Sequence, residues 1–458
     1  MKHYLLLAIC MAAVSLGGCA KESGFPEATG KGSVRAINAI PTSPTFAFLI
    51  QERGIGNVTY KSASSPSSFD DLEYTFNFET VLAGNQTQTR VASQFLDVEA
   101  DKDYTFVISG AIASPDITLW QGDVREWADT DTVFDSQFGH TAASLGAIDV
   151  YFADEAVVPA PGGAIGTLAF GEFLPAVEFP EGDYVLTITA AGDETDVQFV
   201  SNPITVAARS SFLISVFDPD ANDLSPWSVS LFNLIAGGSS LLVDADSGPT
   251  ARFFHTSLNF GATDIYIDDP LTAPFVANHM FGDITADLPV PAGTLPITYT
   301  DVDPMTSILL DLDQSVFNGV HHQFYIVRAT DGADAFVVSR PDRRSVETAG
   351  KLSVINTASG HDLVDVYIGL TGELIDAETQ ELIEGLFPLI PFLPLTGDPI
   401  QLSLAAGSYE IHVTVAGDNT TRLAGPIFLD LSLGDVREAI IYENVDPTMV
   451  DFVFVPAP

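Results

Sequence analysis

Cysteine is almost missing from this chain of 458 residues. The two that it contains, Cys10 and Cys19, lie before residue 20, and none follows. Disulfide bonds within the rest of the chain are therefore excluded, and so are cysteine catalysis and zinc sites built on cysteine ligands. Any folded unit beyond Cys19 has to be stabilised by a packed core.

Basic residues are also scarce. Lys and Arg number 18 against 61 Asp and Glu, which gives a formal net charge of −43. A surface of this charge repels nucleic acid and anionic lipid, so neither is expected as a partner. The acidity either keeps an exposed protein soluble or serves to bind divalent cations, and we favour the first explanation for most of these carboxylates.

Long apolar runs and catalytic motifs are missing too. After residue 20, the longest apolar candidate is residues 386–395, and Pro388, Pro391 and Pro394 interrupt it. The motifs Gly-x-Ser-x-Gly, His-Glu-x-x-His and Gly-Lys-Ser/Thr do not occur. We therefore expect no enzymatic activity.

The beginning of the chain has the organisation of a secretory signal. Lys2 precedes an apolar run over residues 4–16, and Leu-Gly-Gly then leads to Cys19. These last four residues resemble the bacterial lipobox, which implies cleavage before Cys19 and a lipid on its sulfur. Ala20, where a retention signal would be Asp, favours sorting to the outer membrane, facing the periplasm or the cell surface. The expected segments are a signal peptide over 1–18 and a flexible tether over 19–33.

One short pattern recurs along the chain at intervals of domain length. Its copies are Thr-Phe-Ala-Phe at 45–48, Asp-Val-Tyr-Phe at 149–152, Asp-Ile-Tyr-Ile at 264–267 and Asp-Val-Tyr-Ile at 365–368. Residues 409–415 alternate apolar with polar side chains before Ala-Gly-Asp at 416–418, and Ala-Gly-Asp recurs at 191–193. Such alternation followed by Gly-Asp predicts a half-buried strand that enters a hairpin turn. A further landmark closes each unit, at residues 104–108, 212–217, 324–327 and 439–442.

These repeats predict an all-β chain of four antiparallel β-sandwich domains. The expected domains span 34–120, 140–232, 250–338 and 350–456, with linkers at 121–141, 233–249 and 339–350. One helix is expected, at residues 373–386, where apolar side chains would share a face. It falls in an enlarged loop of the fourth domain, residues 371–400.

Several segments resemble a family called domain of unknown function 4397. Residues 34–39 with Pro41 and Pro44 look like its opening, and residues 365–368 and 406–409 look like its inner strands. The first domain lacks the Asp-Val-Tyr and Ala-Gly-Tyr patterns. The resemblance implies a tandem array of immunoglobulin-like or transthyretin-like modules on a bacterial secreted or surface protein. It implies no catalytic activity and supplies no functional residues.

One acidic loop is a candidate metal site. Asp218, Asp220 and Asn222 have the spacing of the first three ligands of a calcium-binding loop. The pattern then fails, because Asp223 occupies the position of the turn glycine and Val229 that of the bidentate Glu. We expect no cofactor, with Ca²⁺ as the alternative, and we favour a solvated acidic loop.

The remaining candidates are aromatic, basic and histidine side chains. Trp120, Trp127 and Trp227 could stack on sugars, although packing in a core or linker is the favoured role for each. A rare basic cluster, Arg340, Arg343 and Arg344, could bind acids of a neighbouring domain. The histidines are expected at the surface or in turns.

The sequence therefore favours a non-enzymatic, lipid-anchored cell-envelope protein, built as a rod of sandwiches for surface interaction or adhesion. Its expected partners are the membrane, through the lipid, and polysaccharide or envelope and surface proteins. The alternative is a carbohydrate-binding or accessory module array. A hydrolase has the least support, because chance pairs of carboxylates are inevitable among 61 acids.

Overall fold

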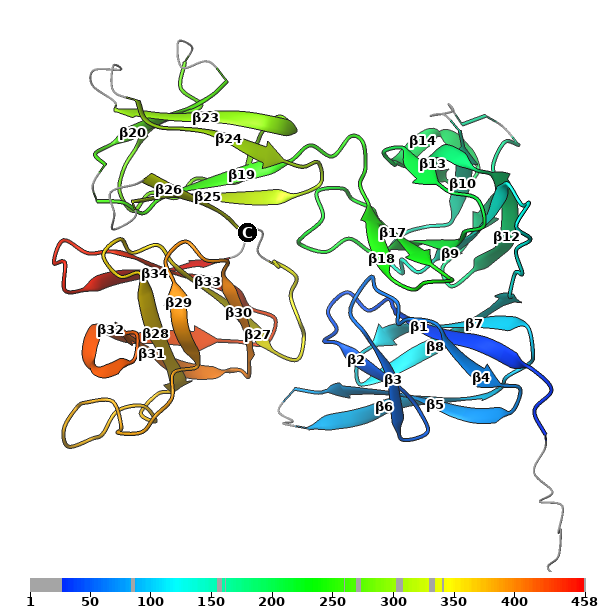
Figure 1. The fold of residues 1–458 in the computed structure, drawn as a ribbon, viewed down its shortest axis with the longest axis horizontal. Helices are drawn as coiled ribbons and strands as arrows, with labels where there is room; N and C mark the ends of the chain where they lie inside the picture. The colour runs from blue at the N-terminus through cyan, green and yellow to red at the C-terminus, as the bar shows by residue number, and fades with distance from the viewer. Residues whose placement is uncertain are drawn as a thin grey trace, which may run out of the picture.

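The computed structural model describes residues 27–456 except 84–86, 155–158, 161, 259, 269–272, 302–307, 329–333 and 340–341. The expected signal peptide, Cys19 and the first part of the tether therefore lie outside the described residues. Within the described part, the chain forms strands and no helix (Figure 1). No helix there is long and apolar enough to cross a membrane.

The strands form eight sheets that pack in four pairs, each around its own apolar core. We number the resulting sandwiches 1 to 4 along the chain. In sandwich 1 one sheet has the order β4 (Ser67–Asp70), β1 (Lys31–Asn38), β7 (Lys102–Ala111), β8 (Ser114–Asp123). The other has the order β3 (Arg53–Val58), β2 (Phe46–Ile50), β5 (Glu73–Val81), β6 (Gln88–Asp97).

Sandwich 2 repeats this topology and adds two strands. Its first sheet is β12 (Phe173–Pro180), β9 (Val133–His140), β16 (Ser211–Phe217), β17 (Ser228–Asn233) and the additional β18 (Ser239–Leu242). Its second is β11 (Gly166–Leu168), β10 (Ile148–Ala153), β13 (Gly182–Ala190), β14 (Asp193–Val200), with the additional β15 (Ile204–Val206) paired to β13.

Sandwiches 3 and 4 have the topology of sandwich 1. In sandwich 3 the sheets are β22 (Leu288–Pro289), β19 (Thr250–His255), β25 (His321–Arg328), β26 (Asp334–Ser339), and β21 (Val276–His279), β20 (Thr263–Ile267), β23 (Gly293–Asp301), β24 (Ile308–Val316). In sandwich 4 they are β30 (Ile400–Leu404), β27 (Gly350–Asn356), β33 (Val436–Glu443), β34 (Val450–Pro456), and β29 (Ile390–Pro394), β28 (Leu363–Leu370), β31 (Gly407–Val415), β32 (Asp418–Leu431).

The fold class expected from the sequence, all-β sandwiches, is confirmed. The structure adds one parallel strand pair in each sandwich, which the sequence did not predict. In every sandwich the first strand pairs in parallel with the seventh strand of the shared topology: β1 with β7, β9 with β16, β19 with β25 and β27 with β33. All other pairs of strands among the described residues are antiparallel. Each sandwich therefore has one mixed sheet and one purely antiparallel sheet.

Hydrogen bonds explain the recurring sequence landmarks. Asp149 and Asp365, the first residues of the Asp-Val-Tyr pattern, each accept a hydrogen bond at 2.8 Å from the backbone N–H of the glycine in Ala-Gly-Asp. Those glycines, Gly192 and Gly417, have φ of +77°, a backbone conformation that side chains disfavour. The aspartate thus holds the hairpin turn of the adjacent strand pair.

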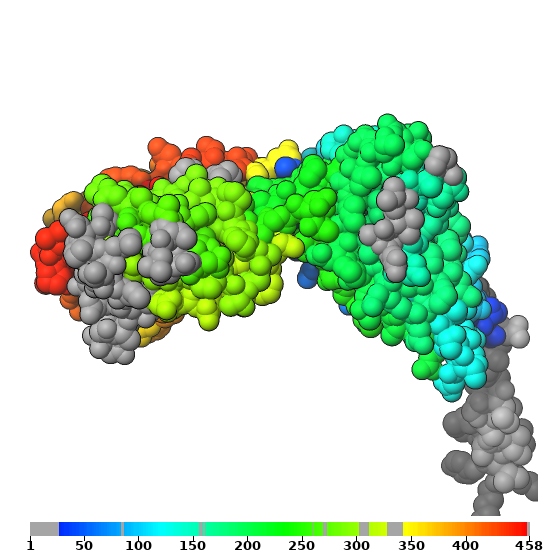
Figure 2. All heavy atoms as spheres, turned by 90° about the horizontal axis from the view of Figure 1, so that it is seen from above, coloured from blue at the N-terminus to red at the C-terminus, as the bar shows by residue number. Residues whose placement is uncertain are grey.

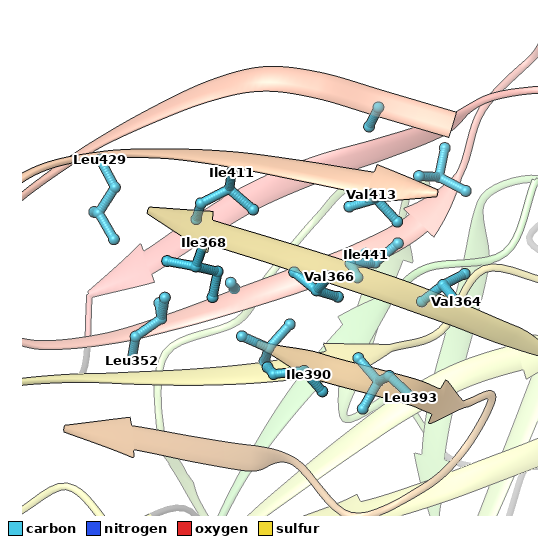
Figure 3. Packing of buried hydrophobic residues seen from close by; sticks show 14 of the residues in the cluster. Leu352, Val364, Val366, Ile368, Ile390, Leu393, Ile411, Val413, Leu429 and Ile441 are labelled. Carbon is cyan, nitrogen blue, oxygen red and sulfur yellow. The ribbon is translucent and has the colours of Figure 1, made fainter. Parts of the chain in front are cut away.

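The cores are formed by the inward-facing residues of each sheet pair. In sandwich 4, Val364, Val366 and Ile368 alternate along β28 and pack between the two sheets (Figure 3). Ile411 and Val413 of β31 lie beside them. Because no disulfide can form in this part of the chain, this apolar burial is the main source of stability.

The structure differs from four local expectations. The predicted helix at 373–386 is absent: Ile375 pairs with Leu382 in a β-bridge, and Leu374 and Leu382 pack on Tyr367. The predicted linker 121–141 is shorter, because β8 ends at Asp123 and β9 already begins at Val133. The predicted linker 233–249 contains β18, and the predicted tether contains the first residues of β1. The apolar residues of 373–386 have the spacing of a helix face, but a loop closed by a β-bridge buries the same side chains. The spacing alone therefore could not distinguish the two structures.

The four sandwiches are not arranged as a rod. In Figure 1, sandwiches 1 and 2 form one pair, sandwiches 3 and 4 form a second, and the chain doubles back so that sandwich 4 lies on the side of sandwich 1. Seen from above, sandwiches 2 and 3 follow each other along the long axis as one continuous body (Figure 2). The expected rod is therefore replaced by a compact block of two pairs.

Each pair is held together by the outer faces of its mixed sheets. Between sandwiches 1 and 2 the apolar cluster contains Ile37, Val107 and Trp120 from one side and Leu213 and Phe217 from the other. Between sandwiches 3 and 4 an equivalent cluster joins residues of β19 and β25 to residues of β27 and β33, namely Phe254, Tyr325, Val327, Ile355 and Ile440. The strands of each parallel pair are therefore buried on both faces.

Replacing Asp365 by Ala should loosen sandwich 4 locally. Besides the Gly417 bond, its carboxylate accepts the backbone N–H of Phe392 at 2.7 Å, so both amides would lose a buried partner. We expect a loss of about 2 kcal/mol, or roughly 30-fold faster amide exchange in β31. Hydrogen-exchange mass spectrometry measures this directly. The exposed Asp430→Ala is the control, and unchanged exchange in Asp365→Ala would show that the turn does not depend on this carboxylate.

Candidate functional site

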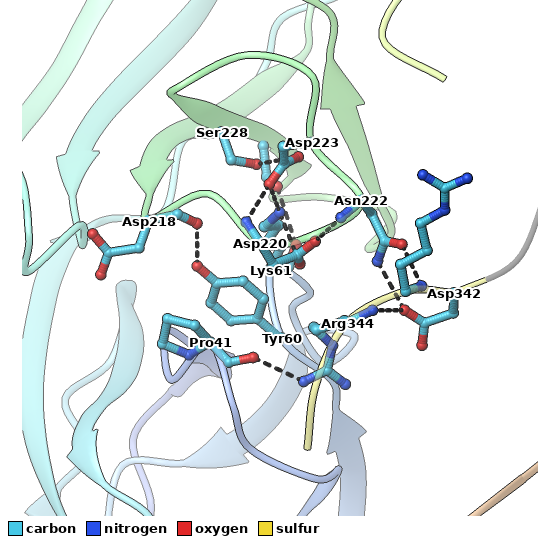
Figure 4. A network of polar contacts seen from close by, with 12 residues as sticks. Pro41, Tyr60, Lys61, Asp218, Asp220, Asn222, Asp223, Ser228, Asp342 and Arg344 are labelled. Atoms are coloured by element: carbon cyan, nitrogen blue, oxygen red, sulfur yellow. Dashed lines mark hydrogen bonds and ion pairs between the residues drawn. The ribbon is translucent and has the colours of Figure 1, made fainter. Parts of the chain in front are cut away.

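The acidic loop at residues 218–223 follows β16 and faces sandwich 1 (Figure 4). The backbone carbonyl of Asp218 accepts a hydrogen bond from the Tyr60 hydroxyl, while its carboxylate accepts the amides of Ala143 and Ser144 at 3.0 and 2.9 Å. Asp220 is turned to a different partner, Lys61. The structure therefore does not bring the carboxylates of Asp218 and Asp220 to one shared position.

Lys61 supplies a positive charge inside this loop. Its ammonium pairs with Asp220 at 3.0 Å and with Asp223, and the three side chains are only 11%, 8% and 5% exposed. Burial raises the pKa of Asp223, and the charge of Lys61 opposes that effect. The solvated loop that we favoured from the sequence does not describe Asp220 and Asp223, whose carboxylates are buried at a contact between two sandwiches.

The third candidate ligand, Asn222, binds a segment from the other half of the molecule. The Nδ2 of its side chain donates to the Asp342 carboxylate at 2.8 Å, and the Oδ1 of the same side chain accepts the backbone N–H of Arg343 at 2.7 Å. Asp342 also pairs with Lys351 at the start of sandwich 4. Across the described residues, no group of three or more His, Cys, Asp or Glu side chains is placed to hold a metal ion.

Two of the three predicted basic residues do bind neighbouring sandwiches. Arg343 forms two hydrogen bonds with Asp287 of sandwich 3, at 2.8 and 3.1 Å. Arg344 donates to the backbone carbonyls of Pro41 and Ser43 in sandwich 1. Arg340 lies outside the described residues. We call residues 60–61, 218–223 and 342–344 together the central junction, because they connect all four sandwiches.

Each sandwich pair has a second, buried polar contact. Between sandwiches 1 and 2, Arg35 pairs with Asp103 at 2.7 Å and donates to the Leu234 carbonyl at 3.0 Å. Between sandwiches 3 and 4, both oxygens of Glu438 are bound, one by the Gln323 amide at 2.9 Å and the other by the Tyr325 hydroxyl. Burial raises the pKa of Glu438, and these two donors oppose the rise.

A cavity of about 360 Å³ lies beside Arg35, between sandwiches 1 and 2. A neighbouring hollow of about 660 Å³ shares part of its lining. The connector from β8 to β9 forms one wall, where Trp127 is half-buried and the Arg125 guanidinium lies 4.3 Å from its ring centre. Asp135 and Gln137 of β9 also line the cavity.

Most residues that line the cavity lie within a part of the chain that matches a known family. Residues 32–151 match the family model described as Domain of unknown function (DUF4397). The match spans nearly all of sandwich 1, the connector, β9 and the first part of β10, and so includes Arg35, Trp127 and Asp135.

The predicted resemblance to DUF4397 is thus confirmed, although sandwich 1 carries the match and has the weakest short patterns. No curated protein matches the chain. Among solved structures, the Bacillus anthracis TIE protein is similar at 10% identity, over 92% of this chain and 76% of that chain, with a TM-score of 0.16.

Within and beside the DUF4397 stretch, the tryptophans have different roles. Trp120 is buried between sandwiches 1 and 2, where it stacks on Phe173 and donates to the Gly171 carbonyl. Trp227 is buried in the core of sandwich 2. Packing is confirmed for these two, and Trp127 is the remaining candidate for stacking on a ligand.

The expectation of surface histidines is wrong. Fully buried His140 and His255 end the first strands of sandwiches 2 and 3, and each binds a backbone carbonyl six residues further on. Asn38 and Asn356 end the equivalent strands of sandwiches 1 and 4 and also donate to backbone carbonyls, those of Val58 and His361. Burial lowers the pKa of His140 and His255, so the neutral form is favoured and both have a structural role.

Replacing Lys61 by Met should strongly destabilise the central junction. Asp220 and Asp223 would remain buried without a counter-charge, which costs about 3–5 kcal/mol. The matched control is Lys31→Met, because Lys31 pairs with Asp70 at the surface, where the side chains are 64% and 48% exposed. That pair is worth about 0–1 kcal/mol. Equal melting temperatures of the two variants would contradict a structural role for Lys61.

Replacing Glu438 by Gln should flatten the pH dependence of stability. Because burial raises the pKa of Glu438 above its ordinary 4.5, the folded chain binds more protons than the unfolded chain just above pH 4.5. Its stability contribution is full below that pH and is lost as the pH rises through the folded pKa. Calorimetry from about pH 4 to 8 should show a steeper loss for the wild type than for Glu438→Gln. Parallel curves would contradict the shift.

Proposed function

We propose that this protein, whose residues 32–151 match the DUF4397 family model, is a non-enzymatic, lipid-anchored envelope protein whose four sandwiches form one compact binding head. The observation that carries the proposal is the central junction. Basic residues are scarce in this chain, yet Lys61, Arg343 and Arg344 all form contacts between sandwiches. These contacts support a fixed arrangement of the four sandwiches. A fixed arrangement is useful for presenting clefts and surfaces to a partner.

The compact head favours interaction close to the membrane over a projecting adhesin. Lys31, where β1 begins, lies 12 positions after Cys19 (31 − 19), so the tether reaches at most about 40 Å. The net charge of −43 repels anionic lipid headgroups and would keep the head off the membrane surface. Partners within this distance are envelope proteins or polysaccharides, in the periplasm or at the cell surface.

Two treatments of cells test this proposal. Cys19→Ser should move the protein from the membrane fraction to the soluble fraction, because the acyl chains are lost. The Cys10→Ser variant is the control and should stay with the membrane. Protease added to intact cells, and then to cells with a permeabilised outer membrane, determines the side: cleavage in intact cells indicates the surface, and protection until permeabilisation indicates the periplasm. Membrane association unchanged in Cys19→Ser would contradict lipid anchoring.

A second candidate function is carbohydrate binding. It is favoured by the cavity between sandwiches 1 and 2, which combines a half-buried indole with polar side chains. Such a combination of one aromatic surface with a few placed polar groups is typical of small-ligand sites.

A further inference from the structure

The cavity between sandwiches 1 and 2 is built from three separate parts of the chain. Sandwich 1 contributes Arg35 and Asp103, the connector contributes Trp127, and sandwich 2 contributes Asp135 and Gln137. The site therefore exists only when the two sandwiches are packed together. Its volume of about 360 Å³ lies within the range of small-molecule sites, about 300–1,000 Å³.

Buried polar atoms around this cavity have no hydrogen-bond partner. Arg35 is 2% exposed and uses one terminal nitrogen for Asp103 and Leu234, but its Nε and its other terminal nitrogen, Nη1, are unbound. The indole Nε1 of Trp127 and the Oδ1 of Asp135 are unbound as well. Buried donors and acceptors without partners are costly, so a ligand that supplies both kinds of partner is favoured.

The charges of the site argue against an anionic ligand. Arg35 is already paired with Asp103, and Arg125 is paired with Glu178 at 2.7 Å. Asp123 and Asp135 add negative charge to the lining. A neutral ligand rich in hydroxyl groups meets these conditions, because each hydroxyl can accept from Arg35 or Trp127 and donate to Asp135.

We propose that this cavity binds a neutral mono- or disaccharide, with Trp127 and Arg35 as donors, Asp135 as acceptor and the indole face not covered by Arg125 as an apolar surface for the sugar ring. Glu438, the buried carboxylate between sandwiches 3 and 4, differs from Asp135 in its hydrogen bonds. Both oxygens of Glu438 are bound by protein donors, whereas Asp135, which lines the cavity between sandwiches 1 and 2, keeps one buried oxygen without a partner. The inference deepens the second candidate function and does not depend on lipid anchoring.

The test is saturation-transfer NMR on the soluble chain that begins after Cys19, followed by calorimetric titration of each sugar that gives a signal. The probes are glucose, galactose, mannose, N-acetylglucosamine, lactose and cellobiose. We expect at least one to bind with a Kd in the millimolar range or below. Trp127→Ala should weaken it at least 10-fold, because both the apolar surface and a donor are lost. Trp127→Phe should weaken it less, since the ring remains.

Phe387→Ala is the matched control, because Phe387 is an aromatic residue 90% exposed on sandwich 4, and its binding should equal that of the wild type. Melting curves confirm that each variant is folded. Absence of binding by all six sugars at about 20 mM overturns the proposal, as does binding that Trp127→Ala leaves unchanged. Displacement of a bound sugar by sodium sulfate would also overturn it, in favour of an anion site. Each of these outcomes is independent of the cell-fractionation result.

Discussion

Burial of both faces of each mixed sheet is the constraint on which the rest of the structure depends. Val34 and Ala36 of β1 point into the core of sandwich 1, while Arg35 and Ile37 point outward. An isolated sandwich would leave Ile37 and Val107 in water, so packing against Leu213 and Phe217 of sandwich 2 removes an apolar face. The same packing places Arg35 and Asp103 in a buried setting and creates the cavity beside them.

The polar contacts then fix how the two sandwich pairs meet. A chain with 18 Lys and Arg against 61 acids has few cations to pair, and several of them are at contacts between sandwiches. Buried ion pairs add little net stability, because desolvation offsets the attraction, but they penalise any other arrangement that would leave a charge unpaired. Lys61 between Asp220 and Asp223 is therefore better understood as a determinant of arrangement than as a source of stability.

Much of the fold could be predicted from the sequence, because local patterns encode it. The alternation of residues 409–415 and the Ala-Gly-Asp turn predict β31 and its hairpin, and the structure shows why Asp365 recurs with them. The compact arrangement was missed, although a signal existed. Residues 324–327 are a continuous apolar run and residues 212–217 are apolar except for Ser215, as expected for strands buried on both faces. The partners of Asp220 and Asn222 could not be predicted, since Lys61 and Asp342 are distant in sequence and only the tertiary arrangement brings them close.

Small-angle X-ray scattering of the soluble chain tests the central claim, that the sandwiches form a compact block of two pairs, most directly. Taking about 13 Å as the radius of gyration of one 100-residue domain, four sandwiches touching in a square give about 27 Å, and the same four in line give about 40 Å. The two-pair arrangement predicts a value below about 30 Å that does not change with salt, because apolar faces hold each pair. A value near 40 Å would contradict it and restore the rod.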